Sequence, residues 1–70
     1  MKNIDLTKLK KGNKIRIVYY DDVNSNKKVS KIGVFEKIFE DNKIYYLYIS
    51  NPKKDFACRV DLIEEIILLD

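Results

Sequence analysis

Hydrophobic and polar residues alternate along several short segments of this chain. In KIRIVYY (14–20), every second side chain from Ile15 to Tyr19 is large and apolar, and the segment is rich in β-branched and aromatic residues. This pattern is typical of a β-strand with one buried face. The same reasoning predicts further strands at 29–39, 44–50 and 55–60. In the last of these, Phe56 and either Cys58 or Ala57 are expected to point inward.

The strand predicted at 29–39, VSKIGVFEKIF, contains a glycine at its centre. A glycine inside a strand pattern often marks a sharp bend or a bulge, so we expect a bend at Gly33. Beyond it, Phe35 and Ile38 are three positions apart, which breaks the two-residue period of a strand. A bulge near Glu36 and Lys37 restores the period and places both apolar side chains inside.

The segment IYYLYIS (44–50) is apolar on both of its faces. We assign Tyr45, Leu47 and Ile49 to the core, because leucine and isoleucine have no polar atom and bury most readily. The outer face then carries Ile44, Tyr46 and Tyr48, and these side chains need a second surface to cover them.

The two ends of the chain give weaker patterns. In NIDLTKLKKGN (3–13), Asp5 or Thr7 is suited to cap one helical turn, which Gly12 then ends. In DLIEEIILLD (61–70), the spacing of Asp61 and Glu64 resembles a capping box, so a helix is one alternative. The β-branched residues and the short length disfavour it, and we favour a helical turn at 61–64 followed by a strand at 65–69.

These elements predict a single domain over residues 1–70. Its fold class is mostly β, a small, strongly curved five-stranded barrel with a short N-terminal helical turn. The segments LKKGNKIRIVYY, IGVFEKIFEDNKIYYLYI and CRVDLIEEIILL resemble the pattern of SH3-like and Sm-like barrels and, more narrowly, that of the YolD-like proteins of Firmicutes. The resemblance covers residues 14–69. It implies a fold more than a function, and it brings no catalytic motif.

Composition narrows the chemistry of this 70-residue chain. One cysteine and no histidine exclude an internal disulfide and a Cys/His metal cage, and Cys58 is expected to be a small buried hydrophobe. No apolar leader follows Met1, and the longest apolar run, at 44–49, is far shorter than a membrane span. We therefore expect a cytoplasmic protein that has no membrane contact and binds no metal.

Catalysis finds little support in the sequence. There is no histidine to serve as a base near neutral pH, and no glycine-rich phosphate loop. Adjacent carboxylates occur at 21–22, 40–41 and 64–65, all beside turns or termini, where such pairs are usually solvated. The sequence predicts a protein that is not an enzyme and uses no cofactor.

One candidate binding surface is basic. The net charge is +3, and positive side chains concentrate near the N-terminus and in the loop after residue 20. They suit either a solvated surface or a sequence-tolerant nucleic-acid site, with tyrosines as stacking platforms. The residues of this predicted set are Lys8, Lys10, Lys11, Lys14, Arg16, Lys27 and Lys28, and Lys31, Lys53 and Lys54 extend it.

The other candidate surface is the surplus of apolar side chains on outer strand faces. Either the N-terminal turn or the long loop covers them, or they contact a protein, a role for which tyrosine is well suited. We expect the second: a non-enzymatic binding module that self-associates or serves as an adaptor or stoichiometric inhibitor, of the kind that phage and mobile elements encode. The predicted protein-binding residues are Val18, Tyr20, Ile44, Tyr46 and Tyr48.

Overall fold

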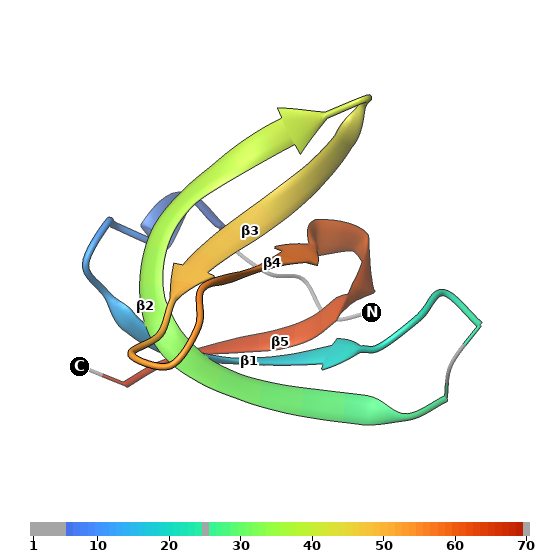
Figure 1. Cartoon of the computed structure of the whole chain (residues 1–70), viewed down its shortest axis with the longest axis horizontal. Helices are drawn as coiled ribbons and strands as arrows, with labels where there is room; N and C mark the ends of the chain where they lie inside the picture. Colours follow the sequence, from blue (N-terminus) through green and yellow to red (C-terminus); the bar gives the residue numbers. More distant parts are fainter. Residues whose placement is uncertain (1–5, 25, 70) are drawn as a thin grey trace.

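The structure is a computed structural model that describes residues 6–24 and 26–69. It contains one antiparallel five-stranded sheet with the strand order β4-β3-β2-β1-β5 (Figure 1). The strands are β1 (Lys14–Tyr20), β2 (Lys28–Asp41), β3 (Ile44–Ser50), β4 (Phe56–Arg59) and β5 (Ile63–Leu68). The helical elements are single 3-10 turns, η1 (Leu6–Lys8) and η2 (Val60–Leu62). The predicted mostly β fold class, with its N-terminal helical turn, is confirmed.

Strand β2 is the longest element and curves strongly, so that the sheet curls around a single core (Figure 1). Gly33 lies within this curved strand, and a Cβ there would overlap Cγ2 of Ile49 and lie 2.7 Å from the carbonyl oxygen of Ser50, so the position has no room for a side chain. The predicted bulge is also confirmed: the register between β2 and β3 shifts between Phe35 and Lys37.

The core lies on the concave face of the sheet. Ile15 and Ile17 of β1 are fully buried, as their alternation predicts, and Phe35 of β2 is nearly so. The other buried side chains are Leu47, Ile49, Cys58 and Ile63. Tyr19, Ile38 and Phe56 are half-buried and pack against this cluster. The inward positions of Cys58 and Phe56 on β4 are confirmed, and Ala57 is exposed.

The prediction that Tyr45 belongs to the core is wrong. Its side chain is 57% exposed, although Leu47 and Ile49 of the same strand are completely buried. Tyr45 pairs with Glu40 near the tip of the β2–β3 hairpin, and this tip projects beyond the rest of the sheet (Figure 1). Tyr45 therefore lies on the core side of β3 but past the point where the core ends.

The C-terminal elements begin earlier than predicted. The helical turn covers Val60–Leu62 instead of 61–64, and the strand covers Ile63–Leu68 instead of 65–69. Ile63 is buried and pairs with Tyr19, and the register of β1 and β5 shifts beside this pair, so that burial of Ile63 fixes the start of β5. The turn is too short for a capping box, and the residue before it, Arg59, makes no side-chain cap.

The segment before β1 is attached to β2 through backbone hydrogen bonds. The amide of Gly12 donates to the carbonyl of Phe35 at 2.9 Å, and the amide of Phe35 donates to the carbonyl of Asn13 at 2.8 Å. Gly12 has a φ of 98°, the left-handed conformation expected at the end of the first turn. Asp5, one of the two predicted caps of that turn, lies outside the described residues. Among those described, no helix is long and apolar enough to span a membrane.

Candidate functional site

Two open hollows border the part of the sheet formed by β3 and β4. The first, called the β4 hollow here, has a volume of about 430 Å³ and is lined by all four residues of β4, Phe56–Arg59. Tyr19 and Tyr20, at the end of β1, also line it. Tyr46 of β3 and Lys31 of β2 line it as well, because the curl of the sheet brings these strands near β4 and the end of β1.

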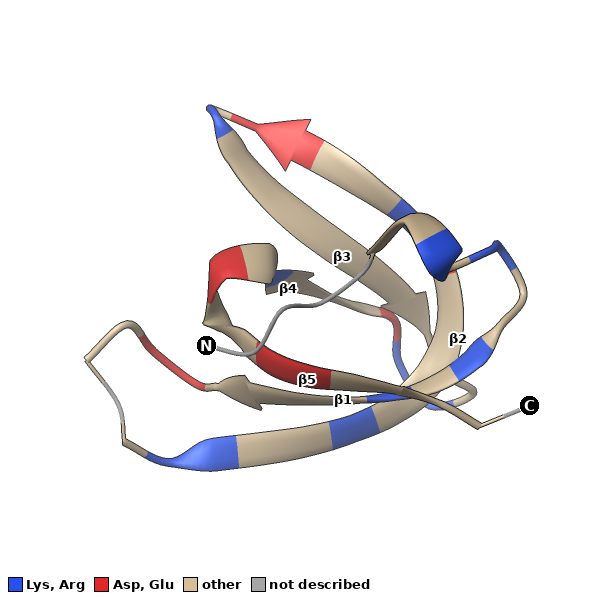
Figure 2. Ribbon diagram, turned by 180° about the vertical axis from the view of Figure 1, so that it is seen from behind, with Lys and Arg blue, Asp and Glu red and all other residues tan. Residues whose placement is uncertain are grey.

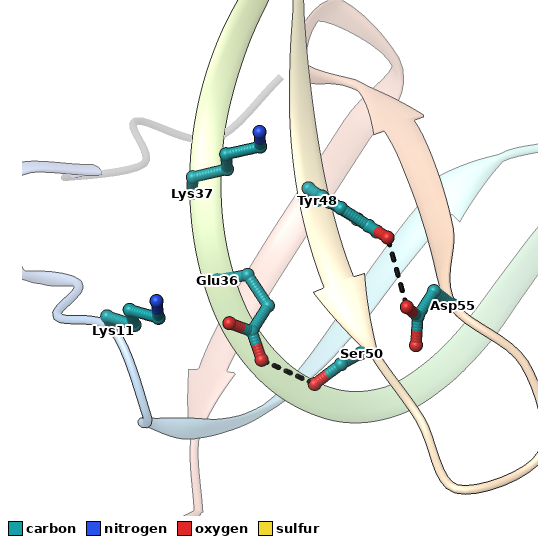
Figure 3. A pocket seen from close by; sticks show the side chains of 6 residues that line it. All are labelled: Lys11, Glu36, Lys37, Tyr48, Ser50 and Asp55. Carbon is teal, nitrogen blue, oxygen red and sulfur yellow. Dashed lines mark hydrogen bonds between the residues drawn. The ribbon is translucent and has the colours of Figure 1, made fainter.

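The second hollow, called the Tyr48 hollow here, has a volume of about 480 Å³ and lies where the N-terminal loop meets the bulge in β2 (Figure 3). The Tyr48 hydroxyl donates to Asp55 Oδ2 at 3.0 Å, and the Ser50 hydroxyl donates to Glu36 Oε2 at 2.6 Å. The bond to Asp55 raises the pKa of the Tyr48 phenol. Lys11 and Lys37 complete the lining, so that two cations balance two carboxylates.

Aromatic rings connect the two hollows along the outer face of β2 and β3. The Phe39 ring stacks on Tyr46, with ring centroids 5.2 Å apart, and meets Tyr48 edge-on at 6.4 Å. The ammonium of Lys37 lies 5.8 Å from the rings of Phe39 and Tyr48. Such contacts hold the three rings against one another.

The charge of the β4 hollow is mainly positive. Of the residues described, Lys31, Lys54 and Arg59 line it together with one carboxylate, that of Asp21. Arg59 donates to both oxygens of Asp61, at 3.1 and 2.7 Å, and these hydrogen bonds raise the pKa of its guanidinium. Arg59 is therefore largely neutralised, which leaves the two lysines as the cations available to a ligand.

Cys58 lines the β4 hollow, but its thiol is unreactive near neutral pH. Its side chain is buried, and burial raises the pKa of the thiol to about 11. The thiolate is the reactive form of cysteine, so very little of it is present near neutral pH. Burial likewise raises the pKa of the Tyr19 phenol, and the nearby Cys58 and Asp21 raise it further. The predicted role of Cys58 as a small buried hydrophobe is confirmed.

The five predicted protein-binding residues are distributed over the curved sheet. Val18 pairs with Ser30 of β2, whereas Tyr48 pairs with Lys37 seven residues further along, about 23 Å at the rise of an extended strand. The curl of the sheet nevertheless brings Tyr20 and Tyr46 to one hollow. Ile44 lies apart from both hollows, near the tip of the β2–β3 hairpin.

The predicted basic set is likewise divided. Lys8, Lys10 and Lys11 precede β1, and Lys14 begins it, whereas Lys28 pairs with Tyr20 at the opposite end, six residues or about 20 Å away. Lys27 adjoins Lys28, and Arg16 lies between the two ends. Figure 2 shows an acidic segment of β5 on the same side of the molecule as the start of β2. The ammonium of Lys28 lies 4.0 Å from Glu64 of that segment.

Sequence reasoning did not bring together the residues that give the β4 hollow its character. It assigned no binding role to Phe56 and Arg59, and it placed Lys31 and Lys54 only in the wider basic set. A signal was present for Lys31. It pairs with the fully buried Ile17, so a lysine stands on the concave face of β2, where an apolar side chain is expected. Among the residues described, no group of three or more metal-ligating side chains is found.

Comparison with known proteins identifies no relative of this chain. The chain matches no family model, and searches of curated proteins and of solved structures give no significant match. The resemblance to YolD-like proteins stays a prediction.

Proposed function

We propose that this chain is a non-enzymatic binding module that works in the cytoplasm through protein–protein contact, as an adaptor or a stoichiometric inhibitor. One observation carries the proposal. Of the five tyrosines in the sequence, four line the two hollows: Tyr19, Tyr20 and Tyr46 one of them, and Tyr48 the other. Tyrosine is enriched at protein interfaces because it buries a large ring and keeps a polar tip.

The charges around the tyrosines also favour a protein partner. The Tyr48 hollow balances two lysines with two carboxylates, and Asp21 and Asp61 reduce the positive charge of the β4 hollow. A phosphate backbone is repelled by carboxylates, whereas protein surfaces carry both signs.

The first prediction tests this surface with the double variant Tyr46→Glu and Tyr48→Glu. We expect loss of self-association, or of a complex with a protein captured from the native cell and then purified, because two charges enter a surface that must lose water on binding. Light scattering of the purified components gives the masses, and circular dichroism confirms that the variant is folded.

Tyr45→Glu is the matched control, because Tyr45 belongs to the same strand but lies exposed on its other face. It should assemble like the parent chain. Tyr20→Glu, at the other side of the β4 hollow, is an independent disrupting variant. Equal binding by the parent chain and by both disrupting variants would contradict the proposal.

Nucleic-acid binding is the second candidate function. It is favoured by the lysines that gather before β1, on one end of the molecule (Figure 2). A gel shift with single-stranded oligonucleotides across a salt series tests it, since phosphate contacts give a steep dependence on salt.

A further inference from the structure

Strand β4 ends the sheet on one side, and its outer edge borders a hollow. In the strand order β4 is terminal, and it pairs along one edge with β3. All four of its residues, Phe56–Arg59, line the β4 hollow. An edge strand presents backbone N–H and C=O groups that a further strand can pair with. The hollow is thus open to an extended chain segment running beside β4.

The side chains opposite β4 in this hollow are positively charged. Lys31 is placed on the concave face by its pairing with Ile17, and its ammonium lies 5.8 Å from the ring of Phe56. Lys54 precedes β4 and lines the same hollow. Neither lysine has a carboxylate partner among the residues that the structure describes. A ligand there is favoured when it carries carboxylates within reach of both ammonium groups.

The aromatic lining suits apolar side chains better than nucleobases. The Phe56 ring stacks with Tyr19 at a centroid distance of 6.4 Å and also carries Lys31 above it. Tyr20 has the ammonium of Lys28 at 5.9 Å from its ring. These contacts occupy ring faces on which bases would have to stack. The ring edges remain as walls for the aliphatic side chains of a strand.

We propose that the β4 hollow binds an extended acidic segment of a partner protein, which adds to the outer edge of β4 as a further strand. This inference rests on the proposed function and names the class of partner. Backbone pairing with β4 supplies the register. Alternate side chains of the segment point into the hollow, where carboxylates meet Lys31 and Lys54 and apolar groups meet the aromatic walls.

Because β4 is short, the charges of Lys31 and Lys54 are important for binding the segment. A four-residue strand offers outward-pointing backbone groups at every second residue only. Backbone pairing alone is therefore weak, and the carboxylate–lysine contacts must supply much of the selectivity. Binding should weaken as salt is added and should depend on the sign of the charges at positions 31 and 54.

The experiment is a display selection of random heptapeptides against the immobilised chain and two charge variants. The parent chain should enrich peptides in which acidic and β-branched residues alternate. Lys31→Glu with Lys54→Glu should reverse the preference to basic peptides. Lys10→Glu with Lys43→Glu, an equal change of charge at two exposed residues that line neither hollow, should leave the acidic preference intact. Lys31→Gln with Lys54→Gln serves if the charge reversal affects folding, and should abolish the acidic preference.

Amide hydrogen exchange of the parent chain with an enriched peptide then locates the binding. Slower exchange in β4 supports strand addition. Three results of the selection would overturn this inference and leave the tyrosine-based contact standing. They are the absence of any enriched peptide, the enrichment of neutral peptides, and the enrichment of the same acidic peptides by the charge-reversed variant. Slow amide exchange of β4 in a dimer without peptide would show that the outer edge of β4 pairs with a second copy of this chain. Displacement of the peptide by an oligonucleotide that binds the hollow more tightly would assign the site to nucleic acid. Either result would overturn the inference.

Discussion

Gly33 is the residue of β2 at which the structure leaves no room for a side chain. A Cβ at this position would meet both a side chain, that of Ile49, and the backbone carbonyl of Ser50. Ile49 is fully buried in the core, and the carbonyl belongs to the paired strand β3 and can move only with the sheet. We expect Gly33→Val to reduce the free energy of unfolding by about 1–3 kcal/mol, as overpacking of a tight site does.

The measurement is the urea midpoint of unfolding, with Ile32→Ala as the control. Ile32 adjoins Gly33 but is 40% exposed, so its truncation should change stability by no more than about 0.5 kcal/mol. An unchanged midpoint for the Gly33 variant would show that β2 tolerates a side chain at its bend.

Cys58 gives a prediction for the dependence of stability on pH. Its pKa rises from 9.0 to about 11 on folding, because burial disfavours the thiolate. As the pH rises above 9, the unfolded chain loses the proton before the folded chain does. The free energy of unfolding should therefore fall between about pH 9 and pH 11.

Tyrosines also ionise in that range, so the comparison with Cys58→Ala isolates the thiol. Unfolding in urea at several pH values should show a shallower decline for the variant, since it has no thiol to ionise. Parallel declines for the two chains would contradict a raised thiol pKa. A second measurement is the rate of alkylation by iodoacetamide, which should rise in step with the thiolate, towards pH 11.

At the scale of elements, alternation along the chain predicted β1 and β3 with the bounds that the structure has. It identifies the face on which a side chain lies but not how far the core extends along that face. Tyr45 shows the difference, because its face is the core face and its position is past the core. The start of β5 was missed for a related reason: the buried Ile63 and the register shift in β1 are set by tertiary packing.

The candidate site was less predictable than the strands. Tyr20, Tyr46 and Tyr48 stand out in the sequence as aromatic residues without an assigned core position. The β4 hollow, in contrast, exists because the curl of β2 brings β4 near the end of β1, and no local pattern encodes that distance. Lys31 becomes a site residue only through its pairing with Ile17 on the concave face.

At the scale of the whole molecule, the distribution of charge bears on the two candidate functions. The net charge is +3, but the predicted basic set is split between the two ends of β1, and Glu64 lies beside Lys28 at one of them. A nucleic-acid strand has to extend along β1, towards the carboxylate of Glu64, to contact both ends. This arrangement favours the proposed protein contact over nucleic-acid binding.

The last prediction follows from this split. If oligonucleotides bind, log K should fall with log salt, and replacing Lys10, Lys11 and Lys14 by Gln should reduce the slope by about 2, at about 0.7 for each phosphate contact of a single strand. Replacing Lys27 and Lys28 by Gln should leave it unchanged, because these residues lie at the opposite end of β1. Fluorescence anisotropy with labelled oligonucleotides gives both slopes. Equal reductions by the two replacements would show that a single strand follows both ends, and nucleic-acid binding would then become the better account of this chain.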